Sequence, residues 1–329
     1  MAHAFAASTR STYGDHVRYF LRWVVWMGYT AFLLDIPYVS TIMLKRYVTF
    51  LALTQSYKTV KLCLNGVRLF YIGRGLPNPM AENFAHHQHL QGIRRMKGDA
   101  TKQKLPITPR ELLWLVSACN TNAPAEVAFT CAALIAFFAF LRKSNVTTGH
   151  QHTEDITHAL LAGDVAVDEQ SYTLWIRLRC TKTLQYSERT LDVPIRGNRG
   201  SPIDPIAWWK LHLQSSALPR AADTHAFAYQ LRGRWVSLTH SAFVKQLKLV
   251  LEQHGIDSRL YASHSFRRGG ATFAFIAGAS GELIKALGDW RSATYLRYID
   301  LGPEMRMIAA QRMATLASQQ MSTSANDNC

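Results

Sequence analysis

The sequence predicts a mostly α-helical chain with a small antiparallel β-sheet, an α+β fold divided into two domains. Three observations support this prediction. Apolar residues recur at helical spacing in the first third of the chain, period-two alternation is confined to residues 164–195, and a basic stretch separates these two regions. A length of 329 residues is sufficient for two domains that each bury their own core.

The first third is predicted to be helical. Residues 11–29 carry one apolar stripe, formed by Val17, Phe20, Leu21, Val24 and Met27, and Pro37 marks the break that follows. A later helix can begin at Ser56 as its N-cap and end at Gly73. Its apolar face comprises Val60, Leu64, Val67 and Tyr71, and another face carries Lys58, Lys61, Asn65 and Arg68. That polar face is either solvated or lies on phosphates.

A basic stretch at residues 94–109 is interpreted as a linker because it has few apolar residues and ends with two prolines. The predicted domains are therefore residues 1–104, with the linker beginning at about residue 94, and residues 105–329. The linker's basic residues, expected to lie across a polyanion, include Arg94, Arg95 and Lys97.

The second domain is predicted to be mixed. Helices are expected near 109–120 and 125–143, and strands at 164–167, 171–179 and 189–195. In the middle strand Leu174, Ile176 and Leu178 alternate with more polar positions, which is typical of a half-buried strand. The chain from residue 204 onward is expected to be helical again.

The charge indicates a polyanionic partner. The chain has 37 Lys and Arg residues against 22 Asp and Glu, a net charge of +15. Residues 1–104 contain 14 basic and 4 acidic side chains, so a net charge of +10 lies in the first domain. Neutralising phosphates releases counterions from a nucleic acid, and double-stranded DNA is the partner that we expect.

Other function classes are disfavoured. The five cysteines are scattered and form no CxxC pair, which argues against a disulfide framework or a zinc cluster, and no metal or cofactor is expected. The most apolar run, residues 127–141, is shorter than the ~20 residues that span a bilayer, so a buried core helix is expected there. Because no signal peptide is visible either, the protein is expected in the cytoplasm of a bacterium or virus-infected cell, or in a eukaryotic nucleus.

The segment at 262–278 indicates a phosphate site. Ser263 can cap a helix whose first turn holds His264 and, three residues later, Arg267. Both side chains then lie on one face at the positive end of the helix, where an anion is stabilised. Arg268 is rotated by about 100° from its neighbour and is expected to play no part.

Six residues in this order resemble the motif set of the tyrosine recombinase (phage integrase) family: Arg142, Lys182, His264, Arg267, Trp290 and Tyr298. They stand in "FLRKSNV", "CTKT", "HSFR" and "GDWRSATYLRYID". The resemblance covers essentially the whole chain and implies a helical core-binding domain ahead of a catalytic domain. The "LRYI" ending and the run into "KLPIT" are most similar to recombinases of eukaryotic mobile elements such as Cryptons.

The resemblance implies a site-specific recombinase that cuts and rejoins DNA through a 3′-phosphotyrosine. Arg142 and Arg267 would hold the non-bridging oxygens, which two permanently charged forked donors can do without a metal. His264 and Trp290 would contact the same phosphate, and Lys182 would protonate the leaving 5′-oxygen. Tyr298 would be the nucleophile.

Two positions depart from the family pattern. The familiar spacing places the nucleophile nine residues after Trp290, at Ile299, whereas Tyr298 lies eight after it and Tyr295 five. We assign Tyr295 to packing. Asn145 stands three residues after Arg142, where the family usually has an acidic residue, which calls catalytic efficiency into question.

The end of the chain adds a possible partner. Residues 302–320 show helical spacing, with Met305, Ile308, Arg312, Leu316 and Gln320 on one stripe. The family's helix after the nucleophile docks on a neighbouring subunit, so a homo-tetramer on DNA is expected, although packing on its own domain is nearly as compatible with the pattern. The last residues, "STSANDNC", are expected to be disordered.

Three alternatives remain open from the sequence. The alternatives are a catalytically silent DNA-binding protein of the same fold, a topoisomerase IB-like enzyme, and a basic helical RNA binder. Filling of all six motif positions argues against the first, and the separate helical domain argues against the second.

Overall fold

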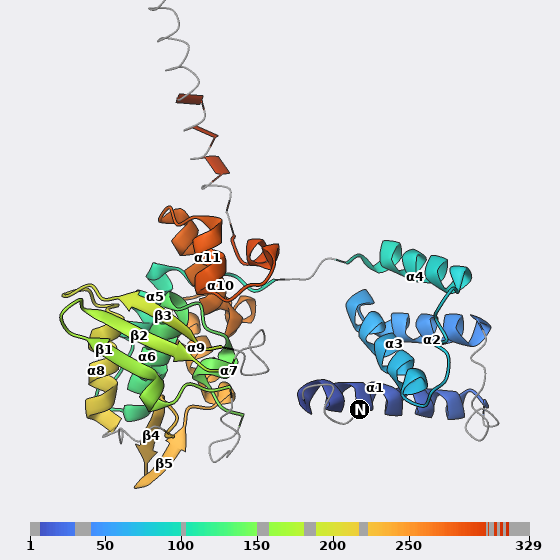
Figure 1. Ribbon diagram of the computed structural model, residues 1–329, viewed down its shortest axis with the longest axis horizontal. Helices are drawn as coiled ribbons and strands as arrows, with labels where there is room; N and C mark the ends of the chain where they lie inside the picture. The colour runs from blue at the N-terminus through green and yellow to red at the C-terminus, as the bar shows by residue number, and fades with distance from the viewer. Residues whose placement is uncertain are drawn as a thin grey trace, which may run out of the picture. The chain divides into compact units, whose positions relative to one another are not determined.

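The computed structural model describes residues 7–29, 41–99, 103–149, 158–180, 189–216 and 223–300, together with 302, 306–307, 310–311 and 314–315. The chain divides into two compact units, Met1–Lys102 and Gln103–Cys329 (Figure 1). The mixture of helices with small antiparallel sheets confirms the predicted α+β fold. Among the described helices, none combines the length and the apolar character that crossing a bilayer requires.

The N-terminal unit is built from helices: α1 (Ala7–Trp26), α2 (Thr41–Thr54), α3 (Tyr57–Ile72) and α4 (Phe84–Lys97). The predicted stripe of α1 enters its core through Phe20 and Val24, joined by Trp23 and by Tyr47 of α2. As predicted, α3 begins after Ser56, whose hydroxyl accepts a hydrogen bond from the Thr59 N–H at 3.2 Å, and ends at Gly73.

Helix α4 corrects the predicted start of the linker. The basic residues Arg94, Arg95 and Lys97 lie in the last turn of this helix, where positive charge complements the unsatisfied carbonyl groups. The helix ends before Gly98, whose φ of 71° few other residues adopt readily.

The C-terminal unit contains α5 (Pro109–Ser117), α6 (Pro124–Phe138), α7 (Lys143–Val146), α8 (Pro205–Ser216), α9 (His240–Gln253), α10 (His264–Ile276) and α11 (Gly281–Leu287). Among its described residues the unit also has the 3₁₀ helices η2 (Ala162–Asp164), η3 (Ser258–Leu260) and η4 (Ala293–Arg297). Helix α6 is the predicted buried core helix, because every residue from Val127 to Phe137 is buried. Helices α8 and α10 pack on it.

The predicted strands form one sheet in the order β1-β2-β3: β1 (Val165–Asp168), β2 (Thr173–Leu178) and β3 (Leu191–Arg196). Both pairs are antiparallel, and Ile176 of β2 lies opposite Val165 and Val193. The alternation in β2 is as predicted, since Leu174, Ile176 and Leu178 are buried in the same core as α6.

Two expectations for this unit were wrong in detail. Helix α6 ends at Phe138 rather than near 143, because the chain turns at Phe140 with a φ of 50°. A second antiparallel hairpin, β4 (Ala228–Leu231) and β5 (Arg234–Ser237), lies where helix was expected. Its turn, Arg232 and Gly233, has two successive positive φ angles, as a tight hairpin requires.

Two glycines allow α10 to approach the rest of the unit closely. A Cβ at Gly269 would collide with the backbone of Ile107, and one at Gly270 would collide with the carbonyl of Phe137 at the end of α6. The second turn of α10 is therefore held directly against α6 and the entry segment of the unit.

Candidate active site

The first turn of α10 carries a buried guanidinium. Arg267 is only 2% exposed, and its two terminal nitrogens donate to the backbone carbonyls of Phe140 and Gly288, the latter at 2.6 Å. Within the described residues its Nε has no hydrogen-bond partner. The predicted helix starts at His264, but Ser263 has helical φ and ψ angles and its hydroxyl does not cap the helix.

Two aromatic rings cover this guanidinium. The Arg267 Cζ atom lies 3.9 Å from the ring centroid of Trp290 and 5.4 Å from that of Tyr298. The two rings are 5.1 Å apart at an angle of 56°. Trp290 is buried, whereas Tyr298 is half-buried. The cation thus lies against both a packed indole and a half-buried phenol.

The remaining described residues of the predicted set lie beside this pair. The ring of His264 is 5.9 Å from that of Tyr298, and His264 is exposed on the first residue of α10. Arg142 precedes α7 and is half-buried, with its backbone N–H held by the side chain of Asn145. The structure therefore brings five of the six predicted residues together; Lys182 lies outside the described residues.

Two guanidinium groups give the site its positive charge. Burial, and then the positive charge of Arg142, lower the pKa of Arg267 to about 9, against the opposing effects of Tyr298 and Asp289. Burial also lowers the pKa of Arg142. Both guanidinium groups keep their charge at neutral pH, so an anion that enters between them would be bound strongly.

The two candidate tyrosines occupy different surroundings. Tyr298 follows the 3₁₀ helix η4 and stands by Arg267 and His264. Tyr295 packs 6.5 Å from Trp290, and its hydroxyl lies where a Cβ on Gly281 would stand. This geometry favours Tyr298 as the reactive phenol and Tyr295 as a packing residue.

Sequence reasoning missed Asp289. This residue is 5% exposed, has a φ of 51°, and pairs with Arg189 at 3.2 Å. The negative charge of its carboxylate raises the pKa of both Arg142 and Arg267, against the opposing effect of burial. The available signal was its place in "GDW", since aspartate tolerates left-handed backbone at a tight turn directly before the indole.

The N-terminal unit presents basic residues on its surface. Six were predicted to contact DNA, and all are exposed: Lys58, Lys61, Arg68, Arg94, Arg95 and Lys97. Lys61 Nζ of α3 and Arg94 Cζ of α4 each lie 5.9 Å from the ring centroid of Tyr57, so the start of α3 and the end of α4 share one basic surface. Arg94 also pairs with Asp99 at 2.8 Å.

The described residues contain no group of three or more His, Cys, Asp or Glu side chains arranged to hold a metal ion. No protein-family model and no curated protein matches the sequence. Solved structures do resemble it. The Tn1549 transposon integrase in complex with a circular-intermediate DNA superposes with a TM-score of 0.60 at 14% identity, covering 95% of each chain.

Two further solved structures have the same fold. A λ integrase dimer bound to a core site has a TM-score of 0.59 at 13% identity and covers 91% of this chain and 90% of its own. The XerH site-specific recombinase, bound to a difH substrate after cleavage, has a TM-score of 0.57 at 15% identity over 85% of this chain and 72% of its own. At these identities the comparison shows the fold that the chain shares with them.

Proposed function

We propose that this chain, which has the fold of the tyrosine recombinases, is a metal-independent DNA strand transferase that acts as a site-specific recombinase. The single observation that carries the proposal is the position of Tyr298 beside the buried guanidinium of Arg267, with Arg142 close enough to lower its pKa. A nucleophile next to two guanidinium groups suits attack on a phosphodiester, whose developing negative charge they can stabilise.

The reaction proceeds in two transesterification steps. The Tyr298 phenol oxygen attacks phosphorus, the bond from phosphorus to the 5′-oxygen breaks, and a 3′-phosphotyrosine forms. His264 accepts the phenol proton, and Lys182 gives a proton to the leaving 5′-oxygen. A 5′-hydroxyl of another strand then attacks the phosphotyrosine and gives its proton to Lys182. The bond from phosphorus to the Tyr298 oxygen breaks, His264 returns the proton to the phenol, and the new strand is sealed.

The arginines stabilise the transition state. Arg142 and Arg267 donate to the non-bridging oxygens, whose negative charge increases as the bonds change. The Nε of Arg267 supplies one donor that none of the described residues accepts. Trp290 supports the Arg267 guanidinium through its 3.9 Å contact.

The N-terminal unit is proposed to clamp DNA. The basic surface around Tyr57 unites residues of α3 and α4 that neutralise phosphates. Residues 1–104 and 105–329 then divide the work between binding and chemistry.

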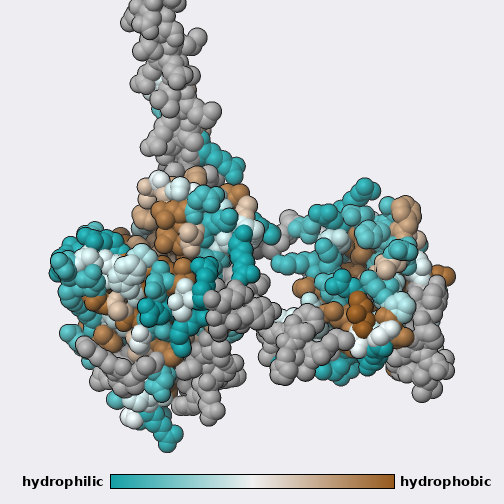
Figure 2. Space-filling view, viewed as in Figure 1, coloured by the Kyte–Doolittle hydropathy of each residue, from teal (hydrophilic) through white to brown (hydrophobic). Residues whose placement is uncertain are grey.

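A tetramer on DNA is proposed to form through the C-terminal segment. The stripe predicted there lies outside the described residues; residues 306–307, 310–311 and 314–315 have helical backbone. Figure 2 shows a hydrophobic patch at the α10 and α11 end of the C-terminal unit. The exposed apolar side chains of these helices are Phe273, Phe275, Ile276 and Leu283, and they suit the apolar stripe of a second copy's last helix.

The test is covalent trapping. Duplexes that the protein selects from a random library are synthesised with 5′-bridging phosphorothiolates, whose released thiol reseals poorly. The proposal expects a denaturant-resistant protein–DNA adduct that forms equally in excess EDTA. An adduct that requires Mg²⁺ would overturn the metal-independent mechanism. Sequence-independent relaxation of plasmids would identify a topoisomerase, and tight binding without an adduct a silent DNA-binding protein.

A further inference from the structure

The residue after the buried guanidinium, Arg268, was expected to play no part, yet it joins two distant segments. Its side chain is only 14% exposed. One terminal nitrogen donates to the backbone carbonyl of Lys104 at 2.6 Å, and the other donates to the Asp300 carboxylate at 2.8 Å. These partners lie more than 160 residues before it and 32 residues after it.

The Asp300 end of this contact reaches the proposed nucleophile. Thr272, one helical turn after Arg268 on α10, donates its hydroxyl to the Tyr298 carbonyl at 3.1 Å. The same hydroxyl accepts the Asp300 N–H at 3.0 Å. The backbone on both sides of Ile299 is therefore tied to α10 by Thr272, and the Asp300 side chain is tied to α10 by Arg268.

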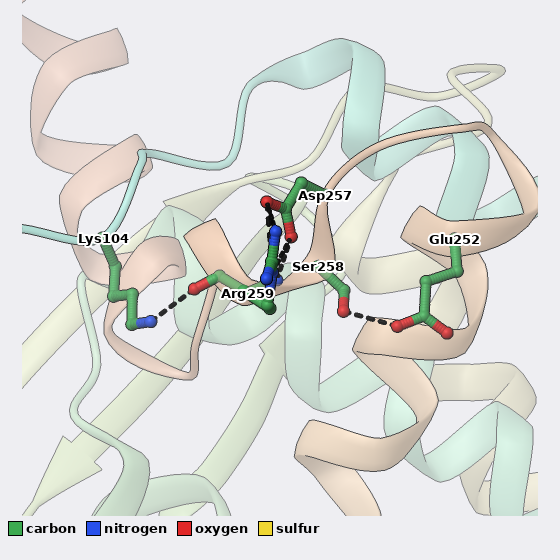
Figure 3. A network of polar contacts seen from close by, with 5 residues as sticks. All are labelled: Lys104, Glu252, Asp257, Ser258 and Arg259. Carbon is green, nitrogen blue, oxygen red and sulfur yellow. Dashed lines mark hydrogen bonds and ion pairs between the residues drawn. The ribbon is translucent and has the colours of Figure 1, made fainter.

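The Lys104 end is firmly seated in the C-terminal unit. The Lys104 ammonium donates to the carbonyl of Arg259 in η3 (Figure 3). The next residues continue the contact, since the Leu105 N–H donates to the Leu260 carbonyl at 2.8 Å and the Ile107 N–H to the Ser265 carbonyl at 3.0 Å. The carbonyl that Arg268 binds thus belongs to an anchored segment just after the boundary between the units.

We infer that Arg268 is a positioning residue for Tyr298, an inference that rests on the proposed function. The phenol must stand in line with the scissile bond, and its backbone follows a short 3₁₀ helix whose residues are mostly exposed. Arg268 fixes that backbone by holding Asp300 with a charged, largely buried side chain. Through the Lys104 carbonyl it also ties the nucleophile's segment to the point where the chain enters the unit.

Two variants test this inference with the full chain. Arg268→Gln removes the charge and one of the two forked contacts, and Asp300→Asn removes the charge on the other side with a smaller structural change. Single-turnover cleavage is measured at saturating DNA, alongside DNA affinity and the unfolding temperature. We expect each variant to cleave roughly 10-fold to 100-fold more slowly with affinity changed only a few-fold. The double variant should be no slower than the slower single variant, because both changes break one connection.

The matched control is Arg259→Gln, which removes an exposed arginine that pairs with Asp257 beside the same segment (Figure 3). Its cleavage rate should equal that of the wild type. A 5′-bridging phosphorothiolate needs no leaving-group proton, so the defect of Arg268→Gln should persist on it. Full recovery on that substrate would overturn the inference by placing Arg268 on the leaving-group side.

A wild-type cleavage rate in both Arg268→Gln and Asp300→Asn would also overturn the inference. So would a fall in cleavage rate that is fully explained by a smaller fraction of folded protein. These outcomes are distinct from failure of the proposed function, in which the wild-type chain itself forms no adduct.

Discussion

Asn145 accepts a hydrogen bond from the backbone N–H of Arg142 at 3.2 Å, and its amide nitrogen donates to the His158 carbonyl at 3.0 Å. Asn145 is 3% exposed, so both contacts are shielded from water. An acidic residue could make the first contact but has no donor for the second. Asparagine is therefore the residue that this neighbourhood requires, and it fixes the backbone from which Arg142 projects.

This relationship predicts that restoring the acidic residue impairs the enzyme. Asn145→Asp would set a carboxylate against the His158 carbonyl, which costs roughly 1–3 kcal/mol of folding free energy. We expect a lower unfolding temperature and slower adduct formation. Urea titrations and single-turnover cleavage measure the two effects, and Asn145→Ala serves as the control that removes both contacts without adding charge. A faster Asn145→Asp enzyme would show that the acidic charge, rather than the hydrogen bonds, is what the site needs.

Stability is predicted to fall in mild acid. His212 and His225 are buried against Phe227, and burial lowers their pKa values to about 4 and about 3. The folded state then keeps them neutral while the unfolded state takes up protons below about pH 6.5. The contribution of the two histidines to the free energy of unfolding is thus complete above that pH and is lost as the pH falls. Between pH 6.5 and pH 5, the proton uptake of each histidine in the unfolded state lowers the free energy of unfolding by about 2 kcal/mol.

The variant His225→Leu tests the cause. Within the described residues neither ring nitrogen of His225 has a hydrogen-bond partner, so the substitution removes no such bond. Hydrogen exchange of the α6 and α8 amides in urea, at about pH 7 and about pH 5, should show a smaller acid loss in the variant. An equal loss in both proteins would place the acid sensitivity elsewhere.

The clamp predicts a specific salt dependence. Replacing Lys58, Lys61 and Arg68 by alanine should flatten the plot of log affinity against log salt by roughly two to three units if all three contact phosphates. Asn65→Ala, a neutral change on the same face of α3, should leave the slope unchanged. Parallel lines for the wild type and the triple variant would mean that this face is only solvated. Cleavage at low salt should survive in the triple variant.

Patterns set by local spacing were predictable from the sequence. The stripe of α1, the start of α3 at Ser56 and the alternation in β2 all follow from burial of one face, which depends only on near neighbours. The hairpin of β4 and β5 was missed because its strands are short and its turn is an Arg-Gly pair.

The predicted site residues came from a motif, and their supporting residues did not. Arg268, Thr272 and Asp289 act through contacts 26 or more residues away in sequence, which no periodicity reveals. Arg268 was misjudged because its direction on α10 was known but the segments that meet it were not. Such contacts become visible only once the fold has brought Lys104 and Asp300 to the same side chain.

The central claim is that Tyr298 becomes joined to DNA. Trapped complexes are digested with protease and nuclease, and mass spectrometry locates the tyrosine that carries the nucleotide. We predict the adduct on Tyr298, its loss in Tyr298→Phe with DNA affinity retained within a few-fold, and its retention in Tyr295→Phe, because Tyr298 alone of the two lies against Arg267 and His264 in the described contacts. An adduct on Tyr295, or one that persists in Tyr298→Phe, would contradict the account.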